Sequence, residues 1–211
     1  MMAHFTGMAS LIRLQRRTPA IRFFGVVFLA FIPAAIIGLL SDSWISQRLF
    51  NPFSVAMALI AGGIIMLWAE NFAPRKPVVL SKVDNLDNLS PMQALTIGLW
   101  QIFSLWPGMS RSMTTIVGAT SVGLSRRAAA EFSFILGAVT LGAASFYKAI
   151  KHHDAILSLG VMPVFAGLLA AFISAFIVVK LFVGLLTRFG LRPWAYYRFM
   201  AAGGYFIRAV S

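Results

Sequence analysis

Long apolar runs separated by short polar segments form the pattern of this chain. A helix of about 20 apolar residues crosses a hydrocarbon core of about 30 Å, so runs of this length predict transmembrane helices. Pro33 should kink the first, while Gly62-Gly63 in the second and Gly137 and Gly142 in the third offer sites for close helix packing. The expected spans are Phe23–Leu40, Phe53–Ala69, Ala128–Tyr147, Leu159–Val179 and Pro193–Ile207.

The stretch between the second and third spans departs from this pattern. Ser90-Pro91 is a helix start, with serine as N-cap and proline at the first helical position. The apolar segment Met92–Trp106 is short and stops at Pro107-Gly108. Two half-length segments joined by such a break predict a re-entrant helix hairpin over residues 91–125, which must lie inside protein or a wet cavity. Its second half is polar, with Ser110, Arg111, Ser112, Thr114, Thr115, Thr120, Ser121 and Ser125.

Composition agrees with an all-α, polytopic membrane protein. The chain is 59% hydrophobic and only 11% charged, whereas soluble domains are about 25% charged. So few charges could not cover the surface of a soluble domain of 211 residues. The chain has no cysteine, which excludes disulfides, thiolate metal sites and cysteine nucleophiles. We therefore expect about five transmembrane helices plus one re-entrant hairpin.

The formal charge of +12 reflects membrane topology rather than nucleic acid, because the basic residues lie between the apolar runs. With a cytoplasmic N-terminus and a hairpin that leaves on the side it entered, eleven Lys and Arg fall inside and four outside. A single crossing by residues 91–125 would move four of the eleven outside and weaken this bias. The inside residues are Arg13, Arg16, Arg17, Arg22, Arg75, Lys76, Lys82, Arg126, Arg127, Arg188 and Arg192; the outside residues are Arg48, Lys148, Lys151 and Arg208.

Arg111 is the centre of the candidate chemistry. An arginine within a membrane segment costs at least about 2.5–3.5 kcal/mol to insert, so it needs a partner or a wet cavity. Free N–H groups at the start of a half-helix, the helix dipole and neighbouring hydroxyls would complete an anion receptor. Because a guanidinium can donate two parallel hydrogen bonds to the oxygens of a phosphate, the expected ligand is a phosphate or diphosphate. The alternative is that Arg111 snorkels to the interface and the hydroxyls only bond neighbouring backbone or helices.

The motifs around this site resemble those of the bacitracin-resistance family of undecaprenyl-diphosphate phosphatases. The second signature of that family resembles Gln93-Ala94-Leu95-Thr96-Ile97-Gly98, followed by Gln101 and by Trp106-Pro107-Gly108-Met109-Ser110-Arg111-Ser112. Three further stretches match: Phe50-Asn51-Pro52 leading to Gly62-Gly63 and Glu70, Ala130-Glu131-Phe132-Ser133-Phe134, and Tyr197-Arg198-Phe199. The resemblance runs from about Arg22 to the end of the chain.

This resemblance implies hydrolysis of undecaprenyl diphosphate to undecaprenyl phosphate and inorganic phosphate, which recycles the lipid carrier for cell-wall synthesis. It implies a multi-pass protein of the bacterial inner membrane, with a polyprenyl diphosphate as partner and a homodimer as a possible assembly. By motif position, the catalytic residues would be Ser110, Arg111 and Thr115, with Ser110 as nucleophile or orienting hydroxyl. Substrate-binding residues would be Gly108, Arg111, Ser112, Thr114 and Gln101.

The family has two inverted-topology halves, and the resemblance implies that the first is incomplete here. It divides the chain into a basic leader over 1–22, the remainder of the first repeat over 23–90, and a second repeat over 91–211. The family's first signature, two glutamates with Ser-Ser and His, has no match, and no glutamate precedes Glu70. We therefore expect a chain without the family's N-terminal quarter, or a start before Met1. Met113, which replaces a glycine of the family, is expected to narrow the anion site.

The missing glutamates bear on the cofactor. The family implies a divalent cation, Mg²⁺ or Ca²⁺, whose usual acidic ligands are not present in this sequence, so we assign no metal ligand. Glu70 and Glu131 are each expected to be an interfacial or helix-packing residue, and His152-His153 to lie in an exposed loop. Two other functions remain open: a protein that binds or transports a lipid phosphate without hydrolysis, in the manner of half-helix sites in transporters, and a non-functional remnant.

Overall fold

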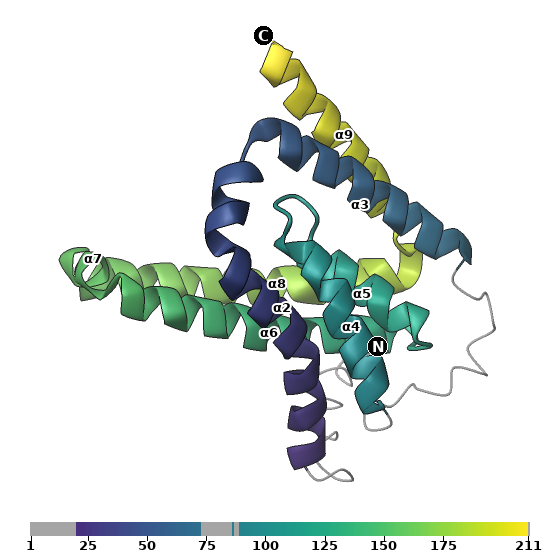
Figure 1. Cartoon of the computed structure of the whole chain (residues 1–211), viewed down its shortest axis with the longest axis horizontal. Coiled ribbons are helices and arrows are strands. Elements are labelled where there is room, and N and C mark those ends of the chain that lie inside the picture. The colour runs from purple at the N-terminus through teal and green to yellow at the C-terminus, as the bar shows by residue number, and fades with distance from the viewer. Residues whose placement is uncertain (1–19, 73–85, 87–88, 211) are drawn as a thin grey trace, which may run out of the picture.

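The computed structural model describes residues 20–72, 86 and 89–210, and over these residues the chain is built from helices (Figure 1). The all-α prediction is confirmed. The basic leader, with Arg13, Arg16 and Arg17, and residues 73–85 of the polar loop lie outside the described residues. The helices are α2 (Ala20–Arg48), α3 (Pro52–Phe72), α4 (Pro91–Ile102), α5 (Arg111–Ser121), α6 (Arg126–Lys151), α7 (His153–Ser158), α8 (Val161–Phe189) and α9 (Arg192–Val210), with a 3₁₀ turn, η4 (Phe103–Leu105), after α4.

Four of the described helices, α2, α3, α6 and α8, are long and apolar enough to cross a membrane. The fifth expected span forms the helix α9, which contains Arg192, Arg198 and Arg208 and is not among these four. The expected end of the fourth span at Val179 is also wrong. Helix α8 continues through Lys180 to Phe189, and the next residue is Gly190, whose φ of 71° suits glycine at a helix C-terminus.

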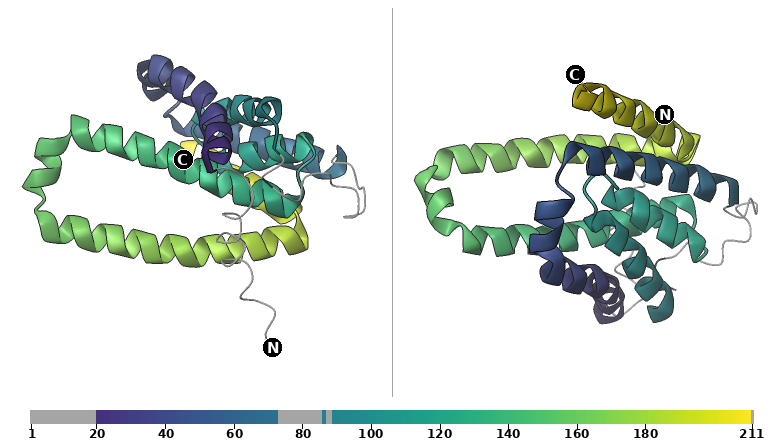
Figure 2. Two further views of the ribbon diagram at one scale, coloured as in Figure 1. Left: turned by 90° about the horizontal axis from the view of Figure 1, so that it is seen from below. Right: turned by 45° about the horizontal axis from the view of Figure 1, so that its top comes forward.

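The helices pack as pairs around the α4–α5 hairpin. Helix α3 lies along α9, and α2 lies against α4, while α5 lies between α4 and α6 (Figure 1). Helices α6 and α8 form a long hairpin that is joined at one end by α7, and their ribbons stand apart over most of their length (Figure 2). The most apolar stretch of α8 has none of its residues buried in the protein, which is the pattern of a helix whose side chains face lipid.

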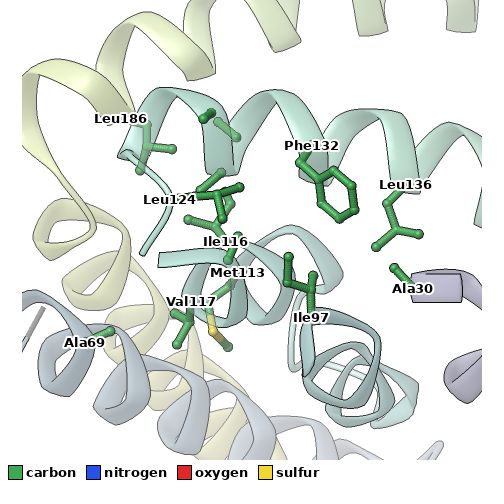
Figure 3. Close-up of a cluster of buried hydrophobic side chains, with 14 of the residues drawn as sticks. Ala30, Ala69, Ile97, Met113, Ile116, Val117, Leu124, Phe132, Leu136 and Leu186 are labelled. Atoms are coloured by element: carbon green, nitrogen blue, oxygen red, sulfur yellow. The ribbon is translucent and has the colours of Figure 1, made fainter. Parts of the chain in front are cut away.

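The hydrophobic core lies where α4, α5 and α6 meet (Figure 3). Ile97 of α4, Ile116 of α5, and Phe132 and Leu136 of α6 are all buried within it. Met113 belongs to the same core and is only 2% exposed. Its side chain therefore packs in the hydrophobic core of the hairpin. It was expected to narrow the anion site, but the structure places it in this core instead.

The hairpin returns the chain to the end at which it began. Ser90 and Gln93 form a capping box at the start of α4, as the Ser90-Pro91 pattern predicts. The Gln93 Nε2 atom also donates to the Val122 carbonyl at 2.9 Å, which joins the start of α4 to the end of α5. Glu70 at the end of α3 contacts both Arg126 at the start of α6 and the backbone N–H of Leu191. These contacts gather one end of the bundle, as a re-entrant hairpin requires.

Candidate anion site

The break between α4 and α5 is held in place by α3. Helix α4 tightens into η4 and ends at Trp106, whose indole Nε1 donates to Ser54 Oγ at 2.8 Å. Gly108 has a φ of 98°, and a Cβ on it would lie 2.7 Å from the Val55 carbonyl oxygen. Only glycine satisfies both the backbone angle and this close approach. The Pro-Gly break is therefore a docked turn with a defined shape.

Arg198 of α9 fixes the same turn from the other side. Its Nη2 atom donates to the Gly108 carbonyl and, at 3.3 Å, to the Ala58 carbonyl, and its Nε atom donates to the Leu59 carbonyl at 3.3 Å. Arg198 is 6% exposed, and a Cβ on Gly62 would overlap its guanidinium. The predicted use of Gly62-Gly63 for close packing is thus confirmed, with Gly63 facing Phe199.

Sequence reasoning did not select Arg198 as a functional residue. The sequence did contain a signal for it, because Arg198 lies inside an expected span. Like Arg111, an arginine in that position needs a partner or a wet cavity. Its partners here are backbone carbonyls, so its role in this structure is to support the turn that precedes Ser110.

Ser110 occupies the N-cap position of α5 without capping it. Its φ is 69° and ψ is 110°, and its side chain makes no capping hydrogen bond. It is the one described residue other than glycine with a positive φ. Such a conformation costs of the order of 1–3 kcal/mol and persists only where the surroundings impose it. The residue is exposed, so its hydroxyl is available at the surface of the break.

Arg111 begins α5 and extends to α6. Its guanidinium lies on Gly137, where a Cβ would be 2.7 Å from Nη1 and would overlap Nη2. Gly137 therefore serves close packing as expected, whereas Gly142 has nothing within 4 Å. Arg111 forms no ion pair with any described carboxylate, and its buried Nη1 atom has no hydrogen-bond partner. A cation held against a helix without a counter-charge is suited to receive an anion.

The threonine hydroxyls of α5 lie behind this arginine. Thr114 Oγ1 donates to the Arg111 carbonyl at 2.9 Å. Thr115 Oγ1 lies 2.9 Å from the same carbonyl and 2.6 Å from Ser133 Oγ on α6. Both threonines are 0% exposed. They brace the first turn of α5 and its contact with α6, which agrees with the alternative expectation that these hydroxyls bond neighbouring backbone and helices.

The structure thus divides the predicted site residues into two layers. Gln101 is 0% exposed and belongs with the two threonines, since its Nε2 atom donates to Thr140 Oγ1 at 3.2 Å. The front layer, which follows the chain through the break and is not fully buried, contains Gly108, Ser110, Arg111 and Ser112. The layer behind it contains Gln101, Thr114 and Thr115.

The acidic residues near the hairpin are engaged elsewhere. Glu70 pairs with Arg126 and joins α3 to α6, as expected of a packing residue, whereas Glu131 Oε1 accepts from Arg127 Nε at 3.0 Å on the surface of α6. His153 and Asp154 form an exposed pair at 3.0 Å. In the described parts of the chain, no three His, Cys, Asp or Glu side chains gather to hold a metal ion. The described residues around this site therefore do not supply a set of ligands that fits a divalent cation.

Comparisons with known proteins find similar sequences over most of the chain. A family model described as bacitracin resistance protein BacA matches residues 1–204. An undecaprenyl-diphosphatase of Thermoanaerobacter pseudethanolicus is 44% identical, over 88% of this chain and 67% of its own length. Proteins of the same name from Caldanaerobacter subterraneus (46% identical, 82% of this chain and 62% of the relative) and Bacillus subtilis (44%, 79% and 59%) are also similar. This chain therefore aligns with about 59–67% of the length of these relatives.

Proposed function

The chain belongs to the bacitracin resistance protein BacA family, and on that premise we propose that it is an undecaprenyl-diphosphate phosphatase. The reaction cleaves the phosphoanhydride bond of undecaprenyl diphosphate with water and yields undecaprenyl phosphate and inorganic phosphate. Relatives that are 44–46% identical carry the name of this activity. The proposal includes a place in the bacterial inner membrane, recycling of the lipid carrier, and a homodimer that cross-linking in membranes would test.

The observation that carries the proposal is the state of Arg111. It is a partly buried arginine at the first position of a half-helix, without a carboxylate partner among the described residues. The first backbone N–H groups of α5 point the same way as its dipole, toward the break. Together they favour a phosphoryl group at the exposed edge of the guanidinium, next to Ser110.

The protein's own groups then have distinct roles in the reaction. Arg111 and the α5 N-terminus would neutralise charge that develops on the phosphoryl oxygens, which is the main demand of phosphoryl transfer. The exposed Ser110 hydroxyl would either attack the terminal phosphorus, which expels undecaprenyl phosphate and leaves a phosphoserine that water then hydrolyses, or orient a water that attacks directly. Gly108 and Ser112 would line the site, while Thr114 and Thr115 keep the first turn of α5 in place. No step is assigned to a divalent cation, because the described residues do not fit one.

A shallow apolar depression, largely open to the surface, is compatible with a lipid as substrate. It lies between α2 and α6, and nearly all of its lining surface is apolar. Helix α6 also carries Gly137, on which Arg111 lies. A hydrocarbon chain and a phosphate headgroup would thus find suitable surfaces on the same helix. The depression is lined by Phe24, Gly25, Val27, Phe28 and Val139.

The two-repeat organisation, 23–90 and 91–211, is part of the same proposal. Pro52-Phe53 in α3 is followed by Ala61-Gly62-Gly63, and Pro193-Trp194 in α9 is followed by Ala202-Gly203-Gly204 at the same spacing. Helices α3 and α9 also pack along each other (Figure 1). Matching motifs on two paired helices are the relationship expected of equivalent elements in an internal repeat.

The test is phosphate release from undecaprenyl diphosphate by the purified chain in detergent, with and without added Mg²⁺ or Ca²⁺. We expect release that falls by at least about 100-fold in Arg111→Ala, the scale for loss of one charge-stabilising group. Arg48→Lys, at the exposed end of α2, is the control and should retain activity. If the chain binds the lipid but releases no phosphate, it is a lipid-phosphate binding protein and not a phosphatase. If it neither binds the lipid nor releases phosphate, it is a non-functional remnant.

A further inference from the structure

Two buried polar atoms of the hairpin have no hydrogen-bond partner. They are Gln101 Oε1 on α4 and Arg111 Nη1 on α5, and no other buried side-chain nitrogen or oxygen of the described residues is in this position. One is an acceptor and the other a donor. Buried polar groups are nearly always paired, so this pair of atoms needs an explanation.

Thr140 of α6 decides which way the Gln101 amide points. The Thr140 hydroxyl donates its proton to the Leu136 carbonyl at 2.7 Å. Its oxygen is therefore left to accept from Gln101 Nε2, at 3.2 Å. Turning the amide over would place two acceptors against each other. The amide nitrogen must face Thr140, and Gln101 Oε1 must remain an acceptor directed elsewhere.

Both orphan atoms belong to residues that lie on the same face of α6. Arg111 contacts Gly137, and Gln101 contacts Thr140, three positions further along the helix. Residues three apart on a helix are neighbours on one face, separated by about 4.5 Å along the axis. A water molecule with hydrogen bonds of about 2.8 Å to each side spans such a distance.

We propose that Thr140 and Gln101 are positioning residues for Arg111, joined to it through one buried water that accepts from Arg111 Nη1 and donates to Gln101 Oε1. The chain then runs from the Leu136 carbonyl through Thr140, Gln101 and the water to the guanidinium. It fixes the plane of the guanidinium against Gly137 and leaves the remaining N–H groups to face a phosphoryl group. Gln101 acts here from behind Arg111, which agrees with its complete burial.

This inference rests on the proposed function, and its test has a binding and a kinetic readout. Inorganic phosphate is the binding probe, read as the shift it causes in the melting temperature of the purified chain. The kinetic readout is the effect of each variant on KM and on kcat, measured separately, for undecaprenyl diphosphate. Thr140→Val removes both hydrogen bonds of the hydroxyl, and Thr140→Ser retains them. Thr120→Val on α5 is the matched control, because Thr120 bonds only to carbonyls of its own helix.

We expect Thr140→Val and Gln101→Met each to weaken phosphate binding and raise KM by about tenfold, the effect of one lost hydrogen bond. The double variant should be no worse than either single variant, because both interrupt one chain. Thr140→Ser and Thr120→Val should stay within about twofold of the unmodified protein. The proposal is overturned if Thr140→Val lowers the melting temperature but leaves the phosphate shift and KM unchanged, or if the two single effects add.

The two proposals fail in different ways. If phosphate shifts the melting temperature through Arg111 but no phosphate is released from the lipid, the phosphatase fails and the binding readout still decides the role of Thr140. If release occurs and the Thr140 and Gln101 variants match the unmodified protein, the positioning chain fails and the phosphatase stands.

Discussion

Glu70 and Arg126 form an ion pair that joins the end of α3 to the start of α6. The other carboxylate oxygen of Glu70 accepts from the Leu191 N–H at 3.0 Å, and Gly190 next to it has no space for a side chain. One carboxylate therefore connects three segments that are far apart in sequence. The charge bias of the sequence predicts that all three segments lie on the cytoplasmic side. The contacts of Glu70 bring these three segments together at one end of the fold.

Loss of the Glu70 carboxylate should destabilise the protein clearly. Its side chain is 11% exposed, so Glu70→Ala leaves a nearly buried backbone N–H unpaired and should cost about 1–3 kcal/mol. Glu131→Ala is the matched control, since it removes an exposed i,i+4 pair worth about 0.3–0.5 kcal/mol. Thermal unfolding in detergent measures both, and equal losses would contradict the role assigned to Glu70.

The two Ala-Gly-Gly motifs offer a test in which the same substitution has opposite effects. A Cβ on Gly62 would overlap the Arg198 guanidinium, whereas a Cβ on Gly203 meets nothing within 4 Å. Alanine is favoured over glycine within a helix by about 1 kcal/mol. We therefore expect Gly203→Ala to be neutral or stabilising and Gly62→Ala to destabilise by about 1–3 kcal/mol through overpacking. The same melting experiment compares them.

The helices and the hairpin were predictable because their signals are local. Apolar run length indicates a membrane helix, and Ser90-Pro91 with Gln93 specifies a helix start within four residues. The end of α8 was misplaced because one lysine interrupts an apolar run without interrupting a helix. The true signal was Gly190, which adopts a positive φ.

The second layer of the site could not be predicted, because it depends on contacts between distant segments. The Arg198 contact with Gly108 spans 90 positions, and the Thr115 contact with Ser133 joins two helices. A sequence shows that a hydroxyl is present but not whether it faces a ligand or a carbonyl. Motif position placed Thr114, Thr115 and Gln101 among the predicted site residues, while their complete burial emerged only in three dimensions.

Arg198 should be needed for the shape of the break. Arg198→Met retains an apolar stem but removes the donor to the Gly108 carbonyl, whereas the Ala58 carbonyl lies inside α3. A hydrogen bond to a charged group contributes about 1.5–3 kcal/mol, and we expect a loss of stability of this size. The stability of Arg198→Lys should fall between those of the unmodified protein and Arg198→Met, because an ammonium cannot form the planar fork that reaches several carbonyls.

Indole fluorescence of Trp106, with the other tryptophans replaced, would report whether its contact with Ser54 loosens. An Arg198→Met protein that melts normally would show that the turn holds its shape without this side chain.

The re-entrant path of residues 91–125 can be tested with single cysteines, because the chain contains none of its own. Met92 at the start of α4 and Ser121 at the end of α5 are exposed, and a hairpin places both at one face of the membrane. Met92→Cys and Ser121→Cys should therefore react with an impermeant thiol reagent from the same side of sealed vesicles. Lys151→Cys, at the far end of α6, should react only from the opposite side and serves as the orientation control. If Met92→Cys and Ser121→Cys react from opposite sides, the segment crosses the membrane once, and the charge distribution and the placement of Arg111 must be reinterpreted together.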